Sequence, residues 1–364
     1  MIYLDYQATT PLAPEAREAM IRHLDGPDGT TFGNPHSSHK LGRQAAAAVE
    51  AARERVAALL PPGGTVIFTS GATEALNGVL RTVACDVHTF ATEHSAVLDC
   101  RYPVGQEGYD FDILPVSREG LADIDALKGV VDDDSHLVAA MAVNNEIGTR
   151  HDLNAIAAVA HKHDAALLVD AVQAFGRIDL TRCPADMIAI SAHKIHGPKG
   201  IGALWLRDRG SVETFQYGGG QEAGLRSGTL SPALCAGFGA AAALAAERMQ
   251  EDAAHVDALW ARARELFADW TLNGSETARW RGNLNIRKDG LDVGRLMSEV
   301  RQVMFSAGSA CASGSGRPSH VLKAIGLGDA EAKSSIRLGF GRYTTMEQLE
   351  EAAKLINNAA SQQM

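Results

Sequence analysis

Short apolar runs, each followed by a polar cluster, recur along the first part of the chain. They lie at residues 65–69, 87–91, 137–143, 166–169, 187–190 and 202–206. Mostly apolar runs of this length predict buried strands. Helical patterns lie between some of them, at residues 39–60 and 152–163. This alternation predicts an α/β fold with a mostly parallel, seven-stranded type of sheet between helices.

The alternation of apolar runs and helical patterns changes after residue 232. A long helical stretch runs to about Trp270, and its run of about 14 apolar residues is too short to cross a bilayer. Shorter strands and helices follow, and the last helix is expected over residues 346–358. We therefore expect a large domain over residues 15–250, a smaller α+β domain over residues 251–364, and an N-terminal segment, 1–14, that joins the small domain.

Composition narrows the classes of function. The 364 residues carry a formal net charge of −10, which argues against a nucleic-acid or anionic-membrane surface. The start of the chain lacks a basic stretch followed by an apolar core, so we expect no signal peptide and a cytoplasmic location. The five cysteines show neither CxxC pairs nor zinc-ligand spacing, which predicts reduced thiols and no metal site.

Two strand ends suggest the chemistry. Asp170 follows the run 166–169, and Lys194 follows the run 187–190. Ligands of open α/β sheets bind at the carboxyl ends of the strands. A lysine and a carboxylate are what pyridoxal 5'-phosphate (PLP) requires, one for a Schiff base and one against its pyridinium nitrogen. Taken alone, Asp170 could instead be a helix cap or ion-pair partner, and Lys194 a surface lysine.

Four further candidates each have a structural alternative. The turn Gly71–Thr73 can bind an anion at a helix N-terminus, or simply cap that helix. His94 can stack on a cofactor and move protons, or be a core histidine. Arg337, in an apolar strand, can bind a substrate carboxylate or form an interdomain salt bridge. Cys311 lies among small residues in a stretch that we expect to be exposed and mobile, as a reactive thiol requires.

In combination the motifs resemble those of the cysteine desulfurases, PLP enzymes of aminotransferase class V. The resemblance runs nearly end to end and is carried by Tyr3–Tyr6, Phe32–Pro35, Thr69–Glu74, Thr92–His94, Val143–Gly148, His193–Gly200, Gly218–Glu222, Arg226–Thr229 and Ser306–Cys311. It implies a fold-type I PLP-dependent transferase that converts L-cysteine to L-alanine. It also implies a homodimer that passes sulfur to an acceptor or iron–sulfur scaffold protein.

The resemblance also implies roles for individual residues. Lys194 would hold PLP covalently, Asp170 would pair with its ring nitrogen, and His94 would stack on the ring. The remaining cofactor-binding residues would be Ala72, Thr73, Asn145, Gln173, Ser191, His193 and, from the partner subunit, Thr229. The substrate would be bound by Arg337, Asn34 and Asn145. Cys311 would accept the sulfur as a persulfide.

Two alternatives remain open at this point. A selenocysteine lyase or another class V PLP enzyme would share the fold and the lysine. A non-catalytic sulfur-relay or scaffold protein could have kept the fold alone, although an intact Lys194 and Cys311 argue against it.

Overall fold

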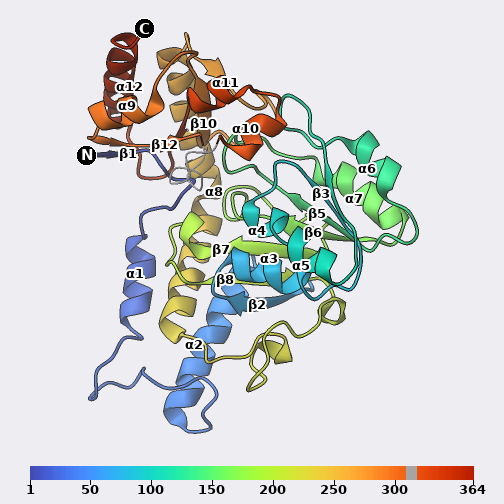
Figure 1. The fold of residues 1–364 in the computed structure, drawn as a ribbon. Coiled ribbons are helices and arrows are strands. Elements are labelled where there is room, and N and C mark those ends of the chain that lie inside the picture. The colour runs from blue at the N-terminus through green and yellow to red at the C-terminus, as the bar shows by residue number, and fades with distance from the viewer. Residues whose placement is uncertain (309–317) are drawn as a thin grey trace.

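The computed structural model describes residues 1–308 and 318–364 (Figure 1). Its main sheet has the strand order β2-β8-β7-β6-β5-β3-β4. The strands are β2 (Thr65–Thr69), β3 (Val87–Phe90), β4 (Phe111–Leu114), β5 (Leu137–Met141), β6 (Ala166–Asp170), β7 (Met187–Ser191) and β8 (Gly202–Leu206). Neighbouring strands are parallel except at β8, which is antiparallel to β2 and β7. The prediction of a mostly parallel, seven-stranded sheet is confirmed.

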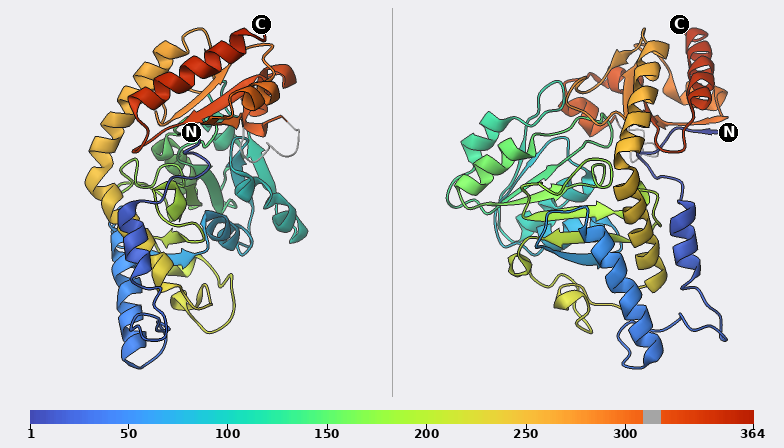
Figure 2. Two further views of the ribbon diagram at one scale, coloured as in Figure 1. Left: turned by 90° about the vertical axis from the view of Figure 1, so that its left-hand side faces the viewer. Right: turned by 180° about the vertical axis from the view of Figure 1, so that it is seen from behind.

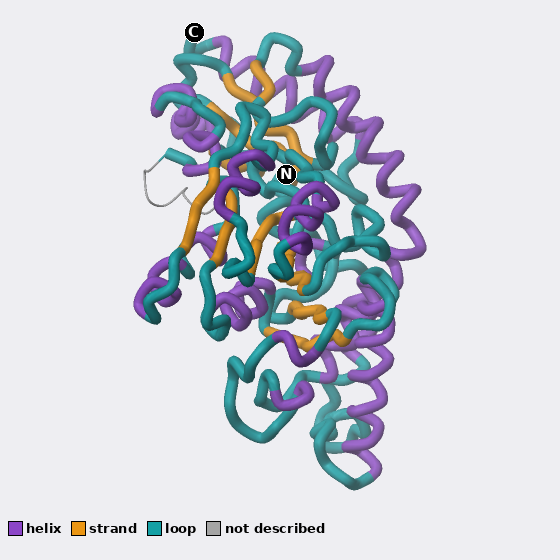
Figure 3. Tube along the Cα trace, turned by 90° about the vertical axis from the view of Figure 1, so that its right-hand side faces the viewer, coloured by secondary structure: helices purple, strands orange, loops and turns teal. Residues whose placement is uncertain are grey.

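Alternate strand residues face two separate hydrophobic cores. In β5, for example, Val138 packs against the helices on one face of the sheet, and Ala139 packs against the helices on the other face. The first face is covered by α1 (Pro14–Ile21), α2 (Lys40–Ala57), α6 (Ile124–Val130), α7 (Leu153–Lys162) and the first half of α8 (Pro232–Leu266). The second is covered by α3 (Ala72–Leu80), α4 (Ser95–Leu98) and α5 (Arg101–Gln106). The sheet therefore lies between two helical layers, as Figure 3 shows.

A second sheet forms in the C-terminal part of the chain. Its antiparallel order is β12-β13-β10-β9, with β9 (Thr271–Leu272), β10 (Asn283–Arg287), β12 (Ser306–Ala307) and β13 (Ser335–Gly339). Here β1 (Ile2–Tyr3) pairs in parallel with β11 (Val303–Met304). The helices of this part are α9 (Val293–Glu299), α10 (His320–Ala324), α11 (Asp329–Lys333) and α12 (Met346–Ser361). The first residues of the chain therefore complete a core that its last hundred residues build.

Helix α8 belongs to both parts. It has 35 residues, a length of about 50 Å at the usual rise per residue. Its Cys235 and Phe238 pack in the core of the main sheet, whereas Leu259 and Trp260 pack in the C-terminal core. Figure 2 shows the helix passing from one part to the other. The predicted division after residue 250 lies inside this helix, and the domain boundaries remain a prediction.

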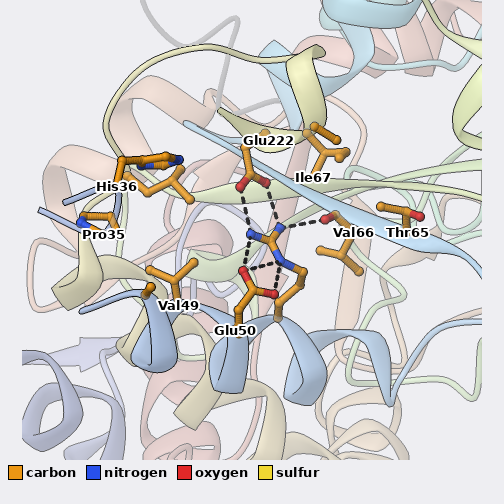
Figure 4. A pocket seen from close by; sticks show the side chains of 12 residues that line it. Pro35, His36, Val49, Glu50, Thr65, Val66, Ile67 and Glu222 are labelled. Carbon is orange, nitrogen blue, oxygen red and sulfur yellow. Dashed lines mark hydrogen bonds and ion pairs between the residues drawn. The ribbon is translucent and has the colours of Figure 1, made fainter. Parts of the chain in front are cut away.

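A buried ion pair fastens the segment after β8 to the edge of the main sheet. Arg53 of α2 donates to both carboxylate oxygens of Glu222, at 2.7 and 2.8 Å, and also binds Glu50 (Figure 4). The pair lines a cavity of about 480 Å³. Glu222 and Ala223 both have positive φ, 46° and 59°, where side chains are strained. The contacts of the Glu222 carboxylate therefore hold a turn that is unfavourable by itself.

Candidate active site

The strand ends converge on a cavity of about 560 Å³. It lies at the carboxyl edge of the main sheet and is closed on another side by Arg337 of β13. Ten of the residues predicted from the sequence line it: Ala72, Thr73, His94, Asn145, Asp170, Gln173, Ser191, His193, Lys194 and Arg337. Parallel strands with buried faces deliver these side chains to one edge, as the sequence led us to expect.

Lys194 follows β7 in a single turn of 3₁₀ helix, Ala192–Lys194. Its ammonium group donates to the carbonyl oxygens of Gln7 and Ala8, the latter at 2.9 Å. The N-terminal segment therefore orients the amine. Sequence reasoning placed no function on Gln7 or Ala8, because a backbone carbonyl leaves no signature in the residue type.

Asp170, at the end of β6, is 7% exposed, and its carboxylate accepts the N–H of Val172 at 2.9 Å. Burial raises the pKa of this carboxyl above its ordinary value, while His94, the Val172 N–H and Lys194 act in the opposite direction. A buried carboxylate of this kind is most stable beside a cation. The protonated ring nitrogen of the expected PLP would be such a cation.

His94 stands at the N-terminus of α4, where its Nδ1 accepts the N–H of Ala96 at 3.0 Å. An accepting Nδ1 means that the neutral ring carries its proton on Nε2. Burial lowers the pKa of His94, and Lys194 adds to this effect while Asp170 opposes it. The imidazole is therefore neutral near neutral pH, which suits both stacking and proton transfer.

The N-terminus of α3 forms an anion cradle. A Cβ added to Gly71 would have only Ser191 Oγ near it, at 4.0 Å, so the space beside this turn is open. The first-turn residues Ala72 and Thr73 and the side chains of Ser191 and His193 line the same cavity. Backbone N–H groups and hydroxyls arranged in this way bind a phosphate group well. The prediction of an anion site at this turn therefore fits the geometry.

Arg337 is 1% exposed and forms a salt bridge, one of its two predicted roles. Its Nη2 donates to Asp5 Oδ1 at 2.7 Å, and its Nη1 donates to the carbonyl oxygen of Asn145 at 3.0 Å. The buried Nε has no partner within residues 1–308 and 318–364. The salt bridge joins β13 to the N-terminal segment, and Arg337 also lines the cavity. Its role toward a substrate carboxylate stays a prediction.

Residues 2–351 of the chain match the family described as aminotransferase class-V. The chain belongs to this family. Cysteine desulfurase IscS of Rickettsia akari (strain Hartford) is 41% identical and is matched over 98% of this chain and 90% of its own length. The homologue of the same name from Rickettsia bellii (strain OSU 85-389) is 40% identical over the same shares. The resemblance found in the motifs is confirmed.

Solved structures agree with this class-V assignment. The structure of a NifS-like protein matches this chain over 99% of the length of each, with a TM-score of 0.91 at 30% identity. A NifS-like protein from Rickettsia africae ESF-5 has a TM-score of 0.89 at 27% identity, again over 99% of both chains. A structure described as SspA in complex with cysteine, 31% identical, covers 95% of this chain and all of its own, with a TM-score of 0.82. The fold is that of the class-V enzymes, which use PLP.

Two predicted residues of this class-V chain lie apart from the cavity. Thr229 and Asn34 are exposed and do not line it in the single chain. Asn34 instead accepts the N–H of His36 at 2.9 Å. Cys311 falls outside the described residues.

The other four cysteines are buried; they are Cys85, Cys100, Cys183 and Cys235. Burial raises the pKa of the Cys235 thiol to about 12 and that of Cys100 to about 11. Such thiols are not ionised near neutral pH, so none of the four has the chemistry of a nucleophile.

The described part of the chain holds neither a cluster of three or more metal-ligating side chains nor a membrane-spanning helix. Among residues 1–308 and 318–364 no group of three or more His, Cys, Asp or Glu side chains is placed to hold a metal ion. Over the same residues, every helix is too short or too polar to cross a membrane.

Proposed function

We propose that this class-V enzyme is a PLP-dependent cysteine desulfurase. It converts L-cysteine to L-alanine and takes the sulfur onto Cys311 as a persulfide, for iron–sulfur cluster assembly or a related pathway. The observation that carries the proposal is one cavity that unites Lys194, Asp170 and His94, in a chain 41% identical to a cysteine desulfurase.

The cavity suits PLP group by group. Lys194 would bind the cofactor covalently, and Asp170 would face its ring nitrogen. His94 would stack on the ring, and Gln173, held by Arg177 at 2.6 Å, would meet the ring hydroxyl. The cradle of Ala72, Thr73, Ser191 and His193 would take the phosphate. When bound, PLP supplies an electron sink for the bond changes at the substrate's Cα.

The protein's own residues would then handle the substrate and its protons. Arg337 and Asn145 would hold the carboxylate of cysteine, since a guanidinium is the best donor for such a group. The amine of Lys194, once released, would move the proton at Cα.

Sulfur transfer would follow at Cys311. Its thiolate attacks the substrate sulfur, so that an S–S bond forms as the C–S bond breaks and its electrons stay with carbon. A proton completes the methyl group of alanine. A free thiol is only a few per cent ionised at neutral pH, so a base is needed. His94 or the substrate would take that proton.

The exposed positions of Thr229 and Asn34 fit a homodimer, and we propose that it works in the cytoplasm. A residue that reaches the cofactor phosphate of a partner subunit must lie at the surface of its own chain. We propose that Thr229 acts across the interface in this way and that Asn34 contributes to the substrate site of the assembled enzyme. An acceptor or scaffold protein would collect the persulfide sulfur.

Replacement of Cys311 tests the function. Cys311→Ser should keep the yellow colour of bound PLP and should still bind cysteine, yet form no persulfide and almost no alanine. Mass spectrometry after a pulse of cysteine measures the added sulfur directly. The matched control is Cys100→Ala, a buried thiol whose loss should leave sulfur transfer intact. Wild-type alanine production by Cys311→Ser, or extra sulfur found on another cysteine, would refute the proposal.

A further inference from the structure

Arg177 does not line the candidate active-site cavity, but it is hydrogen-bonded to two residues that do. Its Nη1 donates to the side-chain Oε1 of Gln173 at 2.6 Å and to the backbone oxygen of the same residue at 3.3 Å. Its Nη2 donates to the backbone carbonyl oxygen of Lys194 at 2.7 Å. Gln173 follows β6 and Lys194 follows β7, which is the neighbouring strand. One guanidinium therefore joins two walls of the cavity from behind.

The Arg177 contact decides which end of the Gln173 amide meets which partner. A guanidinium has N–H donors and no acceptor, so the atom that it binds must be the amide oxygen. The other end of the amide, Nε2, donates to the carbonyl oxygen of Gln7 at 3.1 Å. An NH2 group carries two hydrogens, of which this contact uses one. Gln173 can therefore offer the other N–H, a donor, to a ligand in the cavity that it lines.

A closed circuit of hydrogen bonds connects Arg177 to the side-chain nitrogen of Lys194. The carbonyl oxygen of Gln7 accepts from Gln173 Nε2 and also from the ammonium group of Lys194. Arg177 completes the circuit, because it binds the Gln173 side chain and the Lys194 backbone. Gln7 and Gln173 are both buried, and hydrogen bonds away from water are electrostatically stronger. A change at Arg177 should therefore be felt at the Lys194 nitrogen.

The charge of Arg177 also acts inside the cavity. In the described part of the chain its acceptors are two backbone carbonyls and one amide oxygen, none of them charged. Burial lowers the pKa of the guanidinium to about 10, so it still carries its charge near neutral pH. Burial lowers the pKa of His193, a cavity residue, to about 4, and the charge of Arg177 contributes to this shift after those of two lysines. Such a field favours anionic groups in the cavity and disfavours added protons.

We propose that Arg177 is a positioning residue of this active site, which acts through Gln173 and Lys194 without touching the cofactor. It keeps the Gln173 N–H available to the ring hydroxyl of PLP in its deprotonated, anionic form. This donor and the charge of Arg177 then make a proton less stable on the Lys194 nitrogen once the lysine is joined to PLP. The inference rests on the proposed function. A purely structural role would brace the two loops and leave that proton unaffected.

An absorption titration of the PLP-loaded protein tests the proposal, because the absorption of bound PLP changes when that proton is lost. Arg177→Met keeps much of the side chain's length and removes its charge and its donors. The pH midpoint of the change should rise by about one unit, the size of shift that a neighbouring charge and a hydrogen bond produce. Arg177→Lys keeps the charge without the guanidinium fork, so its midpoint should lie between the two. A wild-type midpoint in a folded variant would overturn the inference.

The matched control is Arg207→Met. Arg207 also donates to a backbone carbonyl, that of Ala185 at 2.7 Å, and also lies over a tryptophan ring, that of Trp205. It does not line the candidate active-site cavity, so its midpoint should stay at the wild-type value. Thermal unfolding of both Met variants measures lost packing. A purely structural arginine would lower the unfolding temperature and leave the midpoint where it was.

A double-mutant cycle tests whether Arg177 acts through Gln173. Gln173→Leu should raise the midpoint by itself, since it removes the donor from the cavity. In that background Arg177→Met should add a smaller shift than it produces alone, because the contact between the two side chains is already lost. Fully additive shifts would contradict the proposal.

Titration and turnover separate this inference from the proposed function. If the PLP-loaded wild type forms no alanine from cysteine, the proposed function fails while the midpoints still decide the role of Arg177. If the wild type is active and a folded Arg177→Met variant titrates like wild type, only the inference about Arg177 fails.

Discussion

At the scale of single residues, Arg337 serves two partners. Its ion pair with Asp5 joins positions that are 332 residues apart in the chain, while the guanidinium also borders the cavity. Sequence patterns predict that a strand end will carry a lysine or a carboxylate to the sheet edge, and Lys194 and Asp170 lie there. They cannot predict that Asp5 meets Arg337, because that contact depends on the N-terminal segment lying beside β13 in the C-terminal part.

Replacing Arg337 distinguishes its two roles. Arg337→Ala should lower kcat/KM for cysteine by about 10- to 150-fold, the value of a charge-assisted contact of about 1.5–3 kcal/mol. Asp5→Asn leaves the guanidinium in place and removes only the ion pair, so its kcat/KM should change far less. Equal losses in the two variants would mean that the arginine acts only through its salt bridge.

At the scale of elements, the apolar runs located most of the main sheet. The expected strand 202–206 matches β8, and the expected helices 39–60 and 152–163 end within three residues of α2 and α7. The pattern could not show that β8 is antiparallel, because a central strand buried on both faces is a continuous apolar run in either direction. Strand β4 escaped prediction because it has only four residues and Asp112 interrupts its short apolar pattern.

The strained turn at Glu222 offers a test at this scale. Glu222→Gln removes one charge of a buried pair and should lower the free energy of unfolding by about 3 kcal/mol. The matched control is Glu50→Gln, which alters the other carboxylate on the same Arg53. The Glu50 side chain is 62% exposed, compared with 3% for Glu222, so this change should cost about 0.5 kcal/mol or less. Denaturant titration measures both, and equal effects would contradict the burial argument.

At the scale of the whole molecule, buried histidines should govern acid stability. Burial lowers the pKa of His151 to about 4, compared with about 6.5 in an unfolded chain. Between these values the unfolded state binds the extra proton, so stability is complete above about pH 6.5 and falls as the pH decreases. His151 alone should remove about 2 kcal/mol between about pH 7 and pH 5.

Unfolding titrations at the two pH values measure this slope. His151→Gln should reduce the loss of stability on acidification, because the buried titrating group is gone. His36→Gln, at an exposed position, should leave the loss unchanged. An unaltered slope in His151→Gln would assign acid sensitivity to other groups.

The pairing of β1 with β11 has a consequence for synthesis. Ile2 and Leu4 are made about 300 residues before Val303 and Met304, against which they hydrogen-bond and pack. At translation rates of about 5–20 residues per second, roughly 15 to 60 s separate the two events. During that interval the main sheet can be completed on the ribosome while its leading apolar end waits unprotected. The first residues to emerge are therefore among the last to be buried, and chaperones that bind nascent chains have their longest opportunity there.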